Sequence, residues 1–132
     1  MSAPFEMWED PEQQARFSFA HVGTDFTTGV LILRQDTELA KHHRPLAFEN
    51  LLQIEGRSQV TLLSEDGRVE ATHDLTPGTF LRMPKGQWHI HANPFDEPSV
   101  TQFKAEGDIT EIVATMRRHY VKVDPDEAPA QL

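Results

Sequence analysis

Two short segments of this 132-residue chain are rich in side chains that bind metal ions or small polar molecules. The second segment contains Gly78, Pro84, Gly86, His89 and Asn93. Its proline and glycines predict tight turns, and the strand expected after Gly86 places alternate residues on one face. His89, His91 and Asn93 therefore share a polar face, which is the arrangement that a binding site needs.

The first segment lies about forty residues earlier and contains His42, His43, Arg44 and Glu49. Imidazole nitrogens and carboxylate oxygens are common ligands of divalent metals. The chain has no cysteine, so any metal must be held by nitrogen and oxygen ligands. Together the two segments predict a site built from residues far apart in the sequence.

The elements that would position these residues are short β-strands separated by turn residues. We expect strands at 16–22, 28–34, 47–55, 58–63, 68–75, 79–83, 87–92 and 100–105. This spacing favours an all-β sandwich or barrel. Near the end, Asp108 is a predicted helix cap and Ile112, Val113 and Met116 share one helical face. A final strand over 112–116 is the alternative, because β-branched residues occur there.

Length and composition predict one domain. We expect an N-terminal arm over 1–14, the β-barrel over 15–122 and a flexible acidic tail over 123–132. The net charge of -9 disfavours nucleic acid as a partner. No apolar stretch is long enough to span a membrane, and no signal-peptide pattern is visible at the start. We therefore expect a cytoplasmic protein.

The second segment resembles the second sequence motif of the cupin superfamily, G(x)5PxG(x)2H(x)3N, at every fixed position from Gly78 to Asn93. The first cupin motif, HxH(x)3-4E(x)6G, is matched by His42, Glu49 and Gly56, but Arg44 stands at the second histidine. The resemblance implies a jelly-roll antiparallel β-barrel, here with one short C-terminal helix.

The resemblance also implies a metal site inside the barrel. In metal-binding cupins the two motifs together hold iron, manganese, zinc, nickel or copper, and His42, Glu49 and His89 occupy ligand positions here. Arg44 cannot ligate a metal, because it stays protonated and has no free lone pair. Three alternatives follow: His43 completes the set if its segment bulges, His91 completes it, or no metal binds and Arg44 grips an acidic ligand.

Two functions follow from these alternatives. The first is a metal-dependent enzyme acting on a small polar or aromatic molecule; dioxygenase, isomerase, lyase and cyclase chemistry are equally compatible, and no catalytic residue is assigned. The second is a non-catalytic protein that binds an anion. The residues predicted to contact the small molecule are Arg44, Gln53, Arg82, His91 and Asn93. Exposed sheet edges and apolar outer faces also predict a homodimer.

Overall fold

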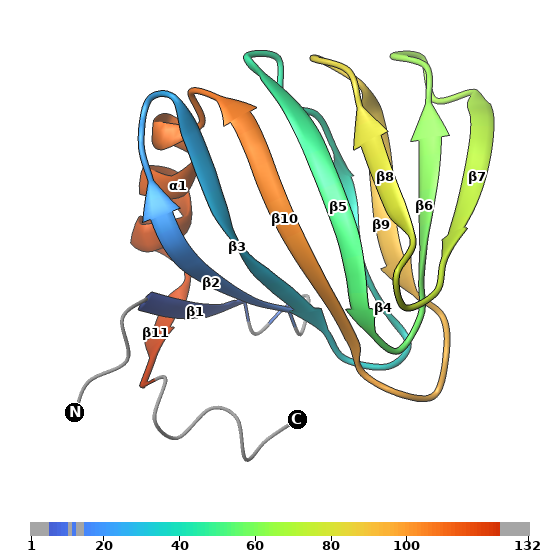
Figure 1. The fold of residues 1–132 in the computed structure, drawn as a ribbon, viewed down its shortest axis with the longest axis horizontal. Coiled ribbons are helices and arrows are strands. Elements are labelled where there is room, and N and C mark those ends of the chain that lie inside the picture. Colours follow the sequence, from blue (N-terminus) through green and yellow to red (C-terminus); the bar gives the residue numbers. More distant parts are fainter. Residues whose placement is uncertain (1–5, 11, 13–14, 125–132) are drawn as a thin grey trace.

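The computed structural model describes residues 6–10, 12 and 15–124, which form strands and one helix (Figure 1). The elements are β1 (Glu6–Asp10), β2 (Ala15–Val22), β3 (Phe26–Leu33), β4 (Thr37–His42), β5 (Ala47–Glu55), β6 (Ser58–Leu63), β7 (Val69–Leu75), β8 (Phe80–Met83), β9 (Trp88–Asn93), β10 (Ser99–Gly107), α1 (Thr110–His119) and β11 (Val121–Val123). Each of the eight predicted strands is present. No helix in the described part has the length and apolar character needed to cross a membrane.

The strands form two antiparallel sheets. One has the order β11-β1-β2-β3-β10-β5-β8 and the other the order β4-β9-β6-β7. Strands distant in the sequence are therefore neighbours, as β10 is between β3 and β5. The prediction of an all-β jelly-roll fold with one short helix is confirmed.

Three strands were not expected from the sequence. β4 covers Thr37–His42, and it pairs with β9. Within the predicted arm, Glu6–Asp10 forms β1, which pairs with β2 and with β11. β11 ends at Val123, where the predicted tail begins. The rest of that tail, apart from Asp124, lies outside the described residues.

The helix α1 lies where the sequence predicted one, but its N-cap residue is Ile109, one position after the predicted cap Asp108, and no side chain caps it there. The carboxylate Oδ1 of Asp108 accepts hydrogen bonds from the backbone N–H (2.9 Å) and the hydroxyl (2.6 Å) of Thr110. Val113 is fully buried, and Ile112 and Met116 pack against the core. The alternative of a strand over 112–116 is wrong. In Figure 1, α1 lies on the side of the molecule that holds β1, β2 and β3, away from β6 and β7.

The apolar core consists of two clusters between the sheets. The larger one contains Phe17, Phe19 and Leu31 together with residues of α1. The smaller one is made of Leu51, Val60, Leu75 and Met83. Phe103 packs against both clusters. The polar residues of the two motif segments therefore enter a cavity whose remaining walls are apolar.

The turn at Gly56 fixes the end of β5. Gly56 has a φ of +64°, and a Cβ atom there would lie 2.1 Å from the carbonyl oxygen of Pro98. Only glycine avoids both the unfavourable conformation and this clash. The backbone conformation and close packing at Gly56 therefore explain why the first motif has glycine at this position, without any ligand.

The side chain of Gln53 makes four hydrogen bonds in the interior of the protein. Its side chain is buried; Nε2 donates to the hydroxyl of Ser99 and to the carbonyl of Glu55, both at 2.9 Å. Its Oε1 accepts from the hydroxyls of Ser58 (2.9 Å) and Thr101 (2.8 Å). This network satisfies every hydrogen-bonding group of the amide, which indicates a role in stability.

Replacing Gln53 by leucine should therefore lower the free energy of unfolding by about 2–4 kcal/mol, because the buried hydroxyls lose their partner. Urea denaturation measures the change. The matched control is Gln59→Leu, which removes only a surface contact to Asp74 and should change stability by less than about 0.5 kcal/mol. Equal stabilities of the two variants would contradict the structural role of Gln53.

Candidate metal and ligand site

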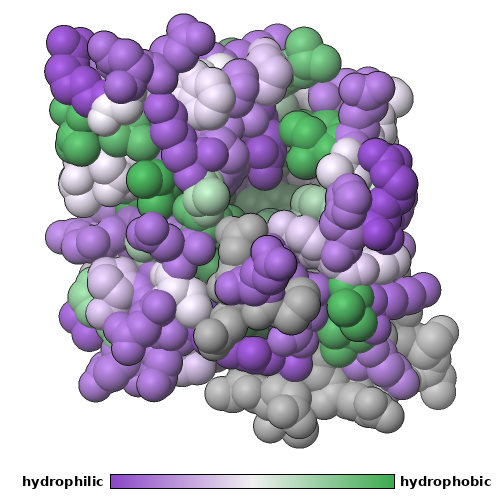
Figure 2. Space-filling model, turned by 180° about the vertical axis from the view of Figure 1, so that it is seen from behind, coloured by the Kyte–Doolittle hydropathy of each residue, from purple (hydrophilic) through white to green (hydrophobic). Residues whose placement is uncertain are grey.

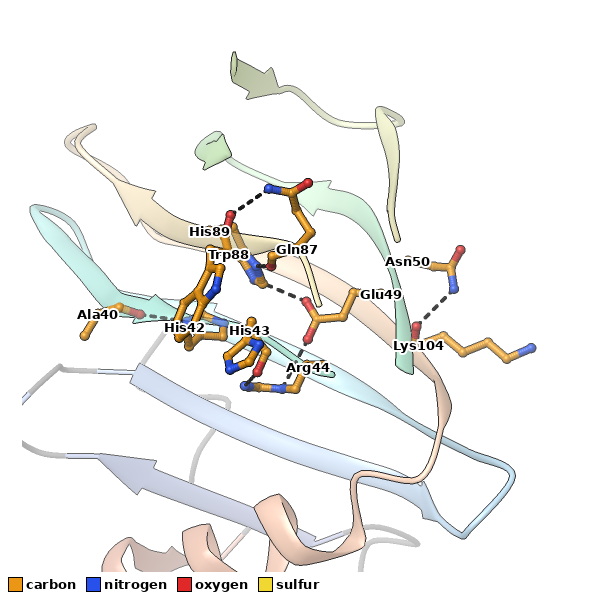
Figure 3. Close-up of polar contacts among 10 residues, drawn as sticks. All are labelled: Ala40, His42, His43, Arg44, Glu49, Asn50, Gln87, Trp88, His89 and Lys104. Carbon is orange, nitrogen blue, oxygen red and sulfur yellow. Dashed lines mark hydrogen bonds and ion pairs between the residues drawn. The ribbon is translucent and has the colours of Figure 1, made fainter. Parts of the chain in front are cut away.

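The two motif segments meet inside the barrel (Figure 3). Glu49 comes from β5, His89 from β9 and His42 from the end of β4. The ligand atoms of these three residues, which we call the His–Glu–His cluster, all lie within 4.8 Å of one another. Nε2 of His89 is 3.3 Å from Oε2 of Glu49. The two segments, which are far apart in the sequence, therefore come together as predicted.

Strand alternation explains two members of the cluster. Along β9, His89, His91 and Asn93 are buried while the residues between them are less so. Glu49 shares its face of β5 with the buried residues Leu51 and Gln53. The polar face predicted for His89, His91 and Asn93 is therefore the inward face of β9.

His42 reaches the cluster because β4 contains a register shift. Leu39 pairs with His91, and the next paired position is His42 with His89. Three residues of β4 thus span the distance that two residues of β9 cover, which is the signature of a β-bulge. Without the bulge, alternation from the buried Leu39 would place Lys41 opposite His89 and turn His42 away.

The same bulge accounts for the position of His43. Its ring stacks on Trp88, with ring centroids 3.7 Å apart and planes inclined by 23°. Lys41 also contacts Trp88, with its Nζ atom over the indole ring and 5.0 Å from the ring centroid. The structure therefore places His43 with Trp88, and His43 is not part of the His–Glu–His cluster.

Backbone carbonyls orient both imidazoles of the cluster. Nδ1 of His42 lies 2.7 Å from the carbonyl oxygen of Ala40, and Nδ1 of His89 lies 2.9 Å from that of Gln87. A carbonyl oxygen only accepts hydrogen bonds, so each Nδ1 carries a hydrogen. The Nε2 atom of each ring is then the one that offers a lone pair. Metal-binding histidines in proteins commonly have this second contact.

Glu49 is the anionic centre of the site. Burial opposes its ionisation, but the hydrogen bond to His89 and the charge of Arg44 outweigh burial and lower the pKa of Glu49 to about 2. Nε of Arg44 lies 3.3 Å from Oε1 of Glu49, so the two carboxylate oxygens face different partners (Figure 3). The lone pairs of the ionised carboxylate and of Nε2 of His89 would repel unless a proton or a metal ion lies between them.

The two other histidines near the centre are uncharged at neutral pH. Burial, His89 and the charge of Arg44 lower the pKa of His42 to about 3. Burial and His89 lower the pKa of His91 to about 4. His91 is 3% exposed, and its Nε2 atom has no hydrogen-bond partner among the described residues. A buried polar atom of this kind favours a ligand that supplies the missing partner.

An inner cavity of about 40 Å³ adjoins the cluster. Its polar lining consists of His42, Arg44, Glu49, His89 and His91, and its other lining residues are apolar. Phe17, Leu39, Ile112 and Met116 are among these apolar residues. The sequence did not assign these residues to the site. For Ile112 and Met116, the amphipathic pattern of α1 was the feature that could have indicated them.

The structure places three residues that were predicted to contact the ligand outside the lining of this cavity. Gln53 belongs to the buried network described above. Arg82 pairs with Glu106, with Nη2 and Oε2 3.2 Å apart on the outer side of the sheet. Nδ2 of Asn93 donates to the carbonyls of Leu33 (3.1 Å) and Glu97 (2.7 Å), which joins the end of β3 to the loop before β10. Arg44 and His91 are the predicted ligand-contacting residues that line the cavity.

Comparison with solved structures identifies the fold. An RmlC-like cupin from Shewanella frigidimarina NCIMB 400 superposes with a TM-score of 0.64 at 14% identity, over 80% of this chain and 86% of that one. The cupin domain of Cnp3 from Schizosaccharomyces pombe gives 0.63 at 17% identity, over 81% and 68%. The protein has the cupin fold. The sequence itself matches no protein-family model and no curated protein.

Cupin-fold neighbours include enzymes and proteins of other kinds. Oxalate oxidase, whose structure is known with the substrate analogue glycolate, superposes with a TM-score of 0.57 at 14% identity and covers 63% of this chain. The chain spans only about half or less of the first solved structures in the comparison, 51% and 42% of their lengths. At these identities the likeness shows the fold alone.

The ligand atoms of the His–Glu–His cluster fit a divalent metal ion. Ligand atoms of a tetrahedral site with bonds of about 2.1 Å lie about 3.4 Å apart. The distance of 3.3 Å between His89 and Glu49 agrees with this value. Two imidazoles and one carboxylate also match the ligand preference of mid-row transition metals. Arg44 is the feature that opposes a cation, because its charge lies beside Glu49.

The stability of the metal-free protein should depend on His91 below neutral pH. The folded-state pKa of about 4 is below the ordinary value of 6.5. As the pH falls from 6.5 towards 4, the unfolded chain binds a proton that the folded chain does not. The free energy of unfolding should therefore decrease, with His91 contributing up to about 3 kcal/mol of the loss. Urea denaturation in EDTA at a series of pH values measures it.

In a His91→Phe variant this part of the pH dependence should disappear. The control is His73→Phe, because His73 lies outside the cavity lining; it should keep the wild-type slope. Parallel pH profiles of wild type and His91→Phe would show that His91 is not held neutral by burial.

Proposed function

We propose that this protein binds a divalent transition metal through His42, Glu49 and His89 and acts on a small molecule whose reacting group enters the adjoining cavity. The observation that carries the proposal is the convergence of three ligand groups within 4.8 Å, with both imidazoles oriented by backbone carbonyls. Such convergence requires a β-bulge in β4 and has no evident benefit for packing alone.

The residues around the cluster have separate roles in this proposal. A bound divalent ion would supply Lewis-acid chemistry. The neutral His91 would hydrogen-bond the small molecule through Nε2, and Arg44 would orient any acidic group on it. The apolar residues Phe17, Leu39 and Met116 would exclude water from the cavity and so strengthen these polar interactions.

A second candidate is a metal-free protein that binds an anion. The contact between Arg44 and Glu49, with Nε and Oε1 3.3 Å apart, favours it. Such a pair neutralises the buried carboxylate without any ion. The remaining donors of Arg44 would then hold the ligand.

Metal analysis distinguishes the two candidates. Protein purified without an affinity tag is dialysed against iron, manganese, zinc, nickel or copper and then against metal-free buffer. Elemental analysis should find about one equivalent of one of these metals in the wild type, and His89→Ala should retain less than about a tenth of it, because a ligand is lost. The control His73→Ala should bind as the wild type does.

A wild type that binds none of the five metals would contradict metal binding and favour the second candidate. Equal metal contents in the wild type and in His89→Ala would place the ion elsewhere. Both results are independent of any knowledge of the substrate.

We also propose a homodimer in the cytoplasm. Support for the dimer comes from the outward face of the seven-stranded sheet, where Phe80 is 60% exposed and Ile54 is 44% exposed. Apolar residues that neighbour one another on a sheet edge are a common contact between identical subunits. The absence of cysteine agrees with a reducing compartment.

A further inference from the structure

A second, larger cavity leads to the His–Glu–His cluster from outside. This outer chamber has a volume of about 350 Å³ and lies between β4 and α1. It shares Phe17, Leu39, His42, Arg44, Ile112 and Met116 with the lining of the inner cavity. The two cavities therefore meet at His42 and Arg44. Seen from behind, the molecule has a central hollow with apolar residues inside it and both hydrophobic and hydrophilic residues at its rim (Figure 2).

The walls of the outer chamber are mainly apolar. Phe17 and Leu39 come from the sheets, and Ile112, Met116 and Tyr120 come from α1 and the residue after it. Its volume lies near the lower end of the range of about 300–1,000 Å³ that is usual for small-molecule sites. The chamber therefore suits the apolar body of a small organic molecule.

The charged lining of the chamber has one sign. Lys41 and Arg44 are the charged residues of its lining, and no aspartate or glutamate is among its lining residues. This is unexpected in a chain with 21 acidic and 12 basic residues. A cavity lined by positive charge with apolar walls raises the local concentration of anions. The charge distribution therefore selects an anionic group on the molecule.

Arg44 has hydrogen-bond donors left for that group. Nε faces Glu49, and Nη1 donates to the carbonyl of His43 at 3.3 Å. Nη2 makes no hydrogen bond among the described residues. A guanidinium that is already fixed by two contacts loses little conformational freedom when it binds a carboxylate.

The charge balance of the site points to the same conclusion. Glu49 and Arg44 neutralise each other, and Glu49 is the only acidic residue in the lining of the inner cavity. A divalent ion on the His–Glu–His cluster would therefore leave two positive charges without a counterion from the described residues. An anionic ligand would supply the missing negative charge.

We propose that the ligand of this site is an amphipathic carboxylic acid. Its carboxylate binds Arg44 beside the His–Glu–His cluster, and its apolar body fills the outer chamber beneath α1. This inference rests on the proposed function, because both place the ligand beside the His–Glu–His cluster. Recognition of the carboxylate by Arg44, however, does not require the metal. Binding of the acid and binding of the metal can therefore be tested separately.

Isothermal titration with 2-naphthoate tests the proposal, and 2-naphthamide is the matched neutral probe. Protein as purified, zinc-loaded protein and EDTA-treated protein are each titrated. We expect 2-naphthoate to bind at least about ten-fold more tightly than 2-naphthamide in all three, because only the acid pairs with Arg44. Acetate, which lacks the apolar body, should bind at least about ten-fold more weakly than 2-naphthoate.

Two variants locate the bound probe. Arg44→Gln should weaken 2-naphthoate at least about ten-fold and leave 2-naphthamide unchanged. Thr115→Trp places a large side chain at an exposed helix position that lines the chamber; it should weaken both probes while zinc still binds. Arg68→Gln is the control for the loss of one positive charge, because Arg68 is exposed and outside the chamber lining.

Failure to bind 2-naphthoate, equal binding of the acid and the amide, or unchanged binding in both Arg44→Gln and Thr115→Trp would overturn the proposal. If Arg44-dependent binding occurs in protein that takes up no metal, the ligand class is supported while the metal site fails. If zinc binds at the cluster and 2-naphthoate does not bind, the metal site is supported while the proposed ligand class fails.

Discussion

The structure of this site depends on the buried carboxylate of Glu49. A carboxylate in an apolar interior is unfavourable by several kcal/mol unless it is paired or coordinated. Here one oxygen faces Arg44 and the other faces His89, at 3.3 Å each. These contacts keep the group ionised, and an ionised carboxylate beside two imidazole rings is a set of ligands for a cation.

The cupin fold supplies these partners from separate parts of the chain. Adjacent strands β5 and β8 belong to one sheet, whereas β4 and β9 belong to the other. Glu49 therefore approaches His89 across the barrel interior, with no contribution from neighbouring sequence positions. The bulge in β4 is the local adjustment that adds His42, since it turns this residue inward opposite His89. α1 then covers the opening through Ile112 and Met116.

Much of the fold followed from strand alternation and turn residues, and the inward face of β9 was predicted correctly for this reason. β4 was missed because its bulge interrupts the alternation from which a strand is predicted. The same interruption explains why the sequence alone left open whether His43 completes the ligand set. Gln53 and Asn93 are buried polar residues that bond to partners far away in the sequence, such as Ser99 for Gln53 and Leu33 for Asn93, so these hydrogen bonds were not visible in the sequence.

The central claim is that His42, Glu49 and His89 bind one metal ion within the barrel. Anomalous diffraction from crystals grown with zinc, recorded on both sides of the zinc absorption edge, tests this claim most directly. The account predicts a single strong peak between the two Nε2 atoms and the Glu49 carboxylate. A map without a peak there, with Glu49 bound to Arg44 and His89 alone, would contradict it.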